Sequence, residues 1–557
     1  MPKNAEEIVN IVTNKGNEAG EKELHKRIDT DFAEWELTKS EASEGMVTAP
    51  ELRDNDIEII ANDVRTFCDH VQSTLVSADR MIRVSMAERG EDMRDEIGKL
   101  ETIFSYALQR ADERLSRLIQ PPLKDQLVWY GILQGSRNAR VLVYKKSNNV
   151  IFDITPLNRR WLKYGVGPEG LLWVSYETFR TKERLESEYD VKAKSDTQNK
   201  VIDWWECDYS KGEIHNSTVY ETKFTKEPDK QNLKSMPFVI LPIATRPQIV
   251  TESGNKESGY GESILAPNRE ITRLLNQLYT IWASHANVLA HLPQLNYMDD
   301  QGIELHSTIS SVDTIINLPM GHNKLESPDI KDISPTLMEL IGLLNMQRQK
   351  GALPDVEYGD LRNIPLSGTA INELKQARNK IFGLQVRNLN EVYSNILRLI
   401  EEQLLTGKLR MDIKTSVRNK YYETKVTPVD LKRPHIINVE FVARTPWEQL
   451  ETAQLADMLK RQGIPDAFLW EKVFKFDDPK RMYTDKAIEL YENSPKGAMV
   501  AALKGLIEDG RIEEAKQLVA DLHQAEMAEQ GEGVPTAPEG EPTGEPSLTP
   551  PMPPLGI

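Results

Sequence analysis

The sequence has few cysteines, no long apolar run and no signal segment. Cys68 and Cys207 are its two cysteines among 557 residues, which indicates a reducing compartment and provides no four-thiol set for structural zinc. Apolar runs such as Phe238–Ala244 fall far short of the roughly 20 residues that a membrane span requires. The N-terminus, MPKNAEE, lacks the apolar stretch of a secretory signal. We therefore expect a protein with no membrane partner that stays where it is made, with each cysteine a small buried side chain.

Motifs that mark catalytic sites are also missing. The sequence lacks G-x-x-x-x-G-K-[ST] for phosphates, H-E-x-x-H for zinc and the nucleophile motif G-x-S-x-G. Gly259-Tyr-Gly261 has no strand directly before it and no third glycine, so we interpret it as a hinge. His285 and His291 are six residues apart, a spacing that does not place two metal ligands on one helix face. The sequence therefore predicts no enzyme, no metal site and no cofactor.

The charge balance argues against a protein that grips nucleic acid over its whole surface. The formal net charge is −17, whereas tight DNA binding requires a dense basic face that replaces counterions along the phosphates. One long helix, expected from Gly368, carries a basic group that could contact phosphates: Lys375, Arg378, Lys380 and Arg387. The alternative is a solvated face balanced by Glu373 and Glu391.

Periodicity in the first half of the chain predicts helices followed by a sheet. Residues 1–50 are polar, with Trp35 as the main apolar anchor, and apolar residues then recur every three or four positions over 57–75 and 97–118. Short β-branched and aromatic runs predict mostly antiparallel strands at 126–133, 140–144, 150–154, 171–176, 201–207, 217–222 and 237–242. A charged helix is expected over 178–189. Trp204 and Trp205 are expected to point to opposite sheet faces, one into the core and one to an interface.

The second half is dominated by long helices. A helix is expected over about 263–290, short strands over 294–332, and a second helix from Ser334-Pro335 to Gly351. The loop 351–367 contains two prolines and no helical period, and a very long helix runs from Gly368 to Leu405. Strands at 409–413 and 436–442 precede a helical block over 446–528. The last residues, 529–557, are rich in Pro, Gly and Glu without Lys or Arg, which predicts an unfolded tail.

This order of elements, with three local motifs, resembles the phage portal proteins, or head–tail connectors, over roughly residues 55–520. Gly259–Leu265 (GYGESIL) followed by Leu274–Leu278 (LLNQL) is similar to the entry of the portal stem. Leu366–Ile371 (LSGTAI) is similar to the start of the family's long helix. Asp153–Trp161 (DITPLNRRW) is similar to a segment of its wing.

The resemblance implies an α+β subunit of a ring, with a helical stem, a mixed clip insert, an α+β wing and a helical crown. The corresponding regions are an N-terminal arm (1–54), wing (55–262), first stem helix (263–293), clip (294–332), second stem helix (333–350), channel or tunnel loop (351–367), long helix with wing strands (368–445), helical C-terminal wing or crown (446–528) and disordered tail (529–557).

The resemblance also implies a structural function in the virion. Such a ring, commonly a dodecamer, is a conduit for double-stranded DNA during packaging and ejection. Its partners are the other portal subunits, the terminase, the capsid or scaffolding protein and a head-completion or adaptor protein. It resides at the portal vertex, after assembly in the host cytoplasm.

Site residues follow from these assignments. In the channel loop, the acids Asp355, Glu357 and Asp360 outnumber the one cation, Arg362, which would repel phosphates and keep DNA centred. In the clip, His322 and Lys324 are expected to contact the next assembly partner. Two other classes stay open at this point: another structural protein of a phage tail or baseplate, and a metal-dependent hydrolase using scattered carboxylates.

Overall fold

The chain divides into two units, Met1–Thr445 and Pro446–Ile557, which are considered separately. The computed structural model describes residues 3–38, 59–86, 93–146, 149–243, 249–251, 254–256, 260–290, 294–298, 315–319, 324–326, 335–353, 368–417, 420–426, 435–442 and, in the second unit, 455–465, 468–469, 473, 486 and 490. Within the second unit, residues 455–461 are helical, in the block where the sequence predicts helices.

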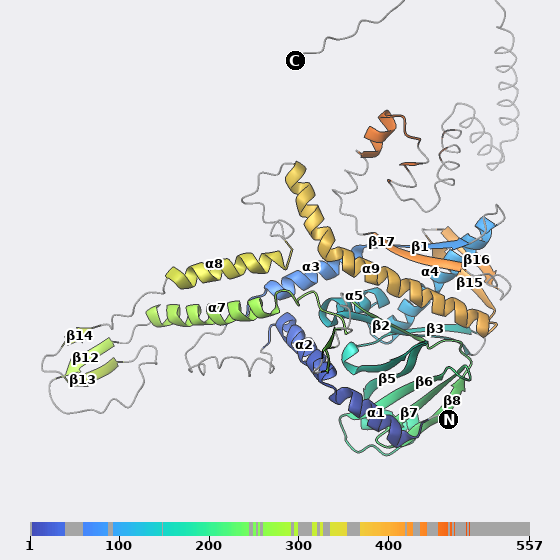
Figure 1. Ribbon diagram of the computed structural model, residues 1–557, viewed down its shortest axis with the longest axis horizontal. Helices are drawn as coiled ribbons and strands as arrows, with labels where there is room; N and C mark the ends of the chain where they lie inside the picture. The colour runs from blue at the N-terminus through green and yellow to red at the C-terminus, as the bar shows by residue number, and fades with distance from the viewer. Residues whose placement is uncertain are drawn as a thin grey trace, which may run out of the picture. The chain divides into compact units, whose positions relative to one another are not determined.

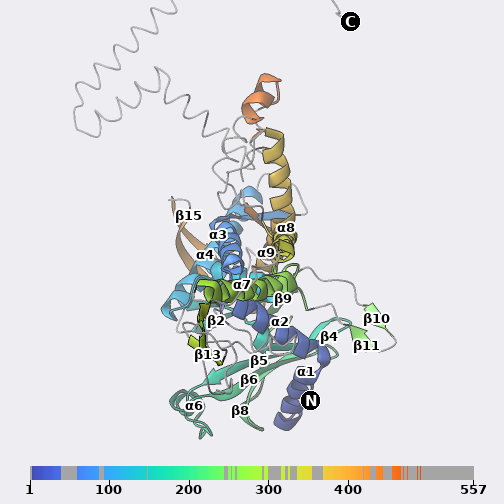
Figure 2. The ribbon, with the colours of Figure 1, turned by 90° about the vertical axis from the view of Figure 1, so that its left-hand side faces the viewer.

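The first unit begins with two helices, α1 (Ala5–Asn17) and α2 (Ala19–Glu36). Asn4 and Glu7 form a capping box that satisfies the first free amides of α1. Ile8 and Val12 of α1 are each 1% exposed, and α1 lies across the five-stranded sheet described below (Figure 1 and Figure 2). The prediction that Trp35 is the main apolar anchor of this segment is wrong, because the amphipathic spacing of α1 supplies a larger buried face.

The largest core lies where helices pack on a small sheet. The helices are α3 (Asp63–Ser77), α4 (Met93–Arg117), α5 (Leu123–Gln134) and α9 (Gly368–Thr406). The sheet has the order β3-β2-β9, from β2 (Ser136–Lys146), β3 (Asn149–Pro156) and β9 (Phe238–Pro242). A separate ribbon of β1 (Asp79–Met86) and β17 (His435–Val442) closes the same core and joins residues 349 to 363 positions apart.

One predicted strand, 126–133, is wrong, because the segment is helix α5. Its apolar residues Leu123, Leu127, Val128 and Ile132 are all at most 1% exposed. A short helix that is buried on most of its sides carries no clear period, so the pattern does not separate it from a buried strand. The tertiary environment, in which α5 contacts α3, β2 and α9, decides the outcome.

A second, five-stranded antiparallel sheet follows, with the order β4-β5-β6-β7-β8. Its strands are β4 (Leu162–Gly167), β5 (Gly170–Arg180), β6 (Asn199–Asp208), β7 (Glu213–Tyr220) and β8 (Lys223–Gln231). The 3-10 turn η2 (Arg159–Trp161) precedes it, and α6 (Lys182–Tyr189) joins β5 to β6. The sequence predicts β5, β6 and β7 but misses β4 and β8, and its helix over 178–189 begins four residues too early.

The adjacent tryptophans of β6 point to opposite faces of this sheet, as the sequence predicts. Trp205 packs in a cluster with Phe238 between the two sheets, and Trp204 stacks on Trp173 beneath α1. The expectation that one of them lies at an interface is wrong, since Trp204 is 1% and Trp205 3% exposed. Helix α1 supplies the second cover that the sequence pattern does not reveal.

The remaining elements belong to the region after residue 248. They are a hairpin of β10 (Ile249–Thr251) and β11 (Gly254–Lys256), helix α7 (Arg269–Ala290), strands β12 (Gln294–Met298), β13 (Ile315–Pro319) and β14 (Lys324–Glu326), helix α8 (Pro335–Lys350), and a hairpin of β15 (Met411–Val417) and β16 (Lys420–Val426). Strand β12 pairs in parallel with β13 and antiparallel with β14. Helices packed on mostly antiparallel sheets confirm the predicted α+β class.

Candidate assembly interface

Helices α7 and α8 lie side by side, before and after the β12–β14 strands in the chain (Figure 1). Leu275 and Leu278 of α7 pack against Ile341 of α8, and all three are buried. The Tyr279 hydroxyl lies 3.2 Å from the Asn345 Oδ1 and 3.1 Å from its Nδ2. Helices α7 and α8 therefore share one buried contact surface.

The opposite side of α8 is apolar too. Leu340, Leu343 and Met346 recur at three-residue spacing and are 41%, 60% and 61% exposed, respectively. A helix with apolar residues on opposite sides needs a partner on both. Helix α7 also exposes Leu274 and Ile281, at 39% and 50%. Contiguous exposed apolar surface of this kind marks an interaction site, so the outer faces of the α7–α8 pair are the candidate interface.

The base of α7 is held by the N-terminal segment. The Arg269 guanidinium donates to both Asp31 carboxylate oxygens of α2, at 2.7 and 2.8 Å, and the Ser263 hydroxyl also donates to Asp31. Burial, followed by the neighbouring Asp31 carboxylate, raises the pKa of Glu34 to about 8. A bidentate pair with a buried carboxylate fixes the direction of the attached helix.

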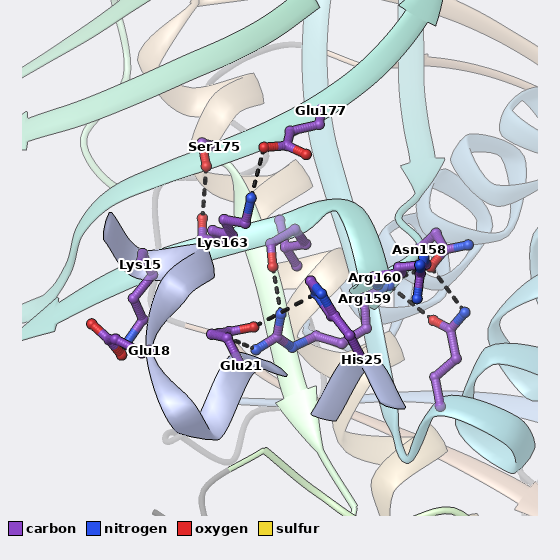
Figure 3. A network of polar contacts seen from close by, with 12 residues as sticks. Lys15, Glu18, Glu21, His25, Asn158, Arg159, Arg160, Lys163, Ser175 and Glu177 are labelled. Atoms are coloured by element: carbon purple, nitrogen blue, oxygen red, sulfur yellow. Dashed lines mark hydrogen bonds and ion pairs between the residues drawn. The ribbon is translucent and has the colours of Figure 1, made fainter. Parts of the chain in front are cut away.

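A polar network joins the same N-terminal segment to the five-stranded sheet (Figure 3). Arg159 Nη2 donates to Glu21 Oε1 at 2.9 Å, and both side chains are 1% exposed. The Arg159 guanidinium also lies over the rings of Tyr164 and Tyr260. Burial lowers the pKa of His25, whose Nε2 is 3.9 Å from the second Glu21 oxygen. The segment therefore links the sheet to the start of α7 through charged contacts at both ends.

A second fully buried arginine, Arg137 of β2, anchors α9. It donates to Leu127 O, Gln385 O, Gln385 Oε1 and Asn388 Oδ1 at 2.7–3.1 Å, and no carboxylate contacts it in the part of the chain that the structure describes. Burial lowers the pKa of Arg137 to about 9. The sequence holds no signal for Arg137 or for the Arg159–Glu21 pair, because their partners come from distant parts of the chain.

A pocket of about 400 Å³ opens between α3, α7 and α8. Its apolar walls include Val64, Phe67, Leu265 and Leu353, and Asp63 and Arg348 pair with each other at its edge. The Oδ1 atom of Asn268 is buried there without a hydrogen bond from any described residue. The pocket lies at the base of the same helices that carry the exposed apolar faces.

The structure places only some of the sequence-predicted site residues. Arg387 is an exposed residue of α9, and Lys324 lies on β14 opposite Tyr297. Three further basic residues lie on the backbone of α9, with side chains outside the described part: Lys375, Arg378 and Lys380. The clip residue His322 and all four loop residues lie outside the described residues: Asp355, Glu357, Asp360 and Arg362.

Cysteine, metal and membrane features can be stated for the described residues. Cys68 is 2% exposed, as predicted, whereas Cys207 is only partly buried, and both thiols are free. Burial raises the pKa of Cys68. Across the described ranges there is no group of three or more His, Cys, Asp or Glu side chains arranged to hold a metal ion. Among the same residues, no helix has the length and apolar character to cross a membrane.

Comparisons with known proteins assign no family. No protein-family model matches the sequence, and no curated protein matches it. A chain of the solved structure described as "Neck of native GTA particle computed with C12 symmetry" is similar with a TM-score of 0.29 and 11% sequence identity, over 73% of this chain and 98% of that chain. At this TM-score and identity, the similarity carries no conclusion about the function of this chain.

Proposed function

We propose that this protein is a structural, non-catalytic subunit of the portal ring at one vertex of a phage capsid. The observation that supports the proposal is the second apolar face of α8, formed by Leu340, Leu343 and Met346, which no described residue of the same chain covers. Exposed apolar faces on α7, at Leu274 and Ile281, are the matching surface on a neighbouring copy. Contacts between two different surfaces of identical subunits generate a closed ring when the rotation between subunits permits.

In this proposal the regions take the functions that the resemblance implies. Helices α1 and α2 are the N-terminal arm, α7 and α8 the stem and strands β12–β14 the clip. The two sheets with α3–α5 are the wing. The clip, with His322 and Lys324, docks the head-completion protein, and the ring as a whole docks the terminase and the capsid or scaffolding protein. The virion and, during assembly, the host cytoplasm are the corresponding locations.

DNA passes through the proposed ring without being held tightly. The net charge of −17 disfavours strong phosphate binding over the surface as a whole. Lys375, Arg378, Lys380 and Arg387 of the α9 helix supply weak attraction, since unit charges 4 Å apart in water interact with only about 1 kcal/mol. Weak contacts break easily, so DNA slides.

The ring is tested by replacing the exposed apolar residues of α8. We expect the wild type to form closed rings in electron micrographs and native mass spectra, and the Leu343→Ser, Met346→Ser double variant to remain folded but dissociate. Val166→Ser is the matched control, because Val166 is 66% exposed on β4, away from the helix pair. A wild type that stays monomeric at micromolar concentrations contradicts the proposal, as does a double variant whose rings match those of the control.

The channel loop is tested by reversing its charge. Changing Asp355, Glu357 and Asp360 to lysine is expected to raise DNA affinity in a salt-dependent way and to slow packaging, because attraction replaces repulsion along the bore. The measurement is the packaging rate of particles whose rings are intact in micrographs. An unchanged rate removes the loop from the mechanism.

A further inference from the structure

The turn at the end of α4 exposes a strained apolar tip. Leu118 is 54% exposed and Ile119 is 96% exposed, and Pro121 and Pro122 beside them are exposed as well. The amide of Ile119 donates to Ser116 O and that of Gln120 to Leu115 O, both at 3.0 Å. These two bonds are the Schellman arrangement, which places Ile119 in the left-handed region at φ 58°.

Isoleucine does not suit the left-handed backbone conformation that this turn requires. Glycine is the usual residue there, and a β-branched side chain at positive φ is strained. Four other non-glycine residues with positive φ occur among the described residues, and none is β-branched: Leu37, Asp190, Glu221 and Lys408. Ile119 therefore combines backbone strain with an almost fully exposed apolar side chain. Among the described residues, none covers the Ile119 side chain or offsets its strain, which points to a contact outside the chain.

The pocket between α3, α7 and α8 has the complementary character. Val64, Phe67, Leu265 and Leu353 supply apolar walls, and its volume of about 400 Å³ is ample for an isoleucine side chain with part of Leu118. The same two helices, α7 and α8, line this pocket and carry the exposed apolar faces of the candidate interface.

We propose that the Leu118–Ile119 tip of one copy inserts into the α3–α7–α8 pocket of the next copy. The inference rests on the proposed ring and adds a second, specific contact to it. The tip and the pocket are different surfaces of one subunit, so the contact is head-to-tail, as ring closure requires.

The first experiment separates folding from assembly. Ile119→Gly relieves the backbone strain, so we expect the unfolding equilibrium constant of the dissociated chain to fall by about five- to thirty-fold. The same change removes the inserted side chain, so the ring dissociation constant should rise about tenfold or more. Glu221→Gly is the matched control: Glu221 also has positive φ, at 54°, and is exposed, but it is polar. The control should stabilise the chain and leave assembly unchanged.

The second experiment locates the contact. Copies with Ile119→Cys are mixed with copies with Ala352→Cys, a lining residue of the pocket, and oxidised within rings. We expect a disulfide-linked dimer that contains one copy of each, and no such dimer from the wild type, whose cysteines are Cys68 and Cys207.

The outcomes distinguish this inference from the proposed function. Rings that form normally with Ile119→Gly overturn the tip contact and leave the ring standing. Weakened rings without the mixed disulfide overturn the pocket as the receiving site. A wild type that forms no ring overturns both proposals.

Discussion

Replacing Arg159 by methionine tests the buried ion pair that holds the N-terminal segment on the five-stranded sheet. Glu21 and Arg159 are each 1% exposed and 2.9 Å apart, so the variant leaves the Glu21 carboxylate buried without its cation. Breaking a buried pair from one side costs about 3–5 kcal/mol, because the remaining charge is neither solvated nor paired. We expect the free energy of unfolding to fall by about that amount.

The double replacement Glu21→Leu, Arg159→Met gives the second half of the test. With no charge left behind, well-packed apolar residues are expected to restore most of the lost stability. The assay is urea unfolding followed by tryptophan fluorescence, because Trp173 and Trp204 stack with centroids 5.0 Å apart beneath α1 and report its release. Lys182→Met is the control: its pair with Asp196 has a similar distance of 3.1 Å but is exposed, and its loss should not be measurable. An Arg159→Met variant as stable as this control would refute the reasoning.

Three further predictions concern the titration of a buried acid, the packing around a buried arginine and the C-terminal tail. The pKa of Glu34 is raised from its ordinary 4.5 to about 8, so between these pH values the folded chain keeps a proton that the unfolded chain loses. The free energy of unfolding should therefore fall as the pH rises from 4.5 to 8. Glu34→Gln should reduce this fall, measured as the difference between the urea midpoints at pH 5 and pH 8.5, and an equal difference in both proteins would contradict the prediction. Gly131→Ala should destabilise the fold although alanine favours helices, because the new Cβ would lie 2.6 Å from the Arg137 guanidinium, which four hydrogen bonds hold in place. Gly98→Ala, whose Cβ meets nothing within 4 Å, should instead stabilise α4 by up to about 1 kcal/mol. The measurement is the melting temperature of each variant, and a shift of both in the same direction would argue against close packing of Gly131 on Arg137. Deleting 529–557 should leave both the circular dichroism spectrum and ring formation unchanged, because that segment has too little apolar surface to fold; loss of soluble protein would show that it is structural.

The sequence by itself determined the helices whose apolar residues recur over several turns. Helix α8 spans Pro335–Lys350 and α9 spans Gly368–Thr406, within one or two residues of the predictions, because Ser334-Pro335 and Gly407 mark their ends locally. The apolar seam of α7 and α8 is also visible in the sequence. The sequence does not show that the apolar residues on the far side of α8 are exposed, since periodicity says which residues share a face but not what covers that face.

Tertiary structure decided the elements and contacts whose determinants lie far apart in the chain. The segment 126–133 is a helix because packing surrounds it with apolar residues, which removes the period that would have identified it. Strand β1 exists because β17 supplies its hydrogen bonds from the other end of the unit. Arg159 meets Glu21 across 138 positions and Arg137 meets Gln385 across 248, and only the folded chain brings these groups together. Local spacing encodes helices and strands, whereas burial and the pairing of buried charges depend on which distant segments become neighbours.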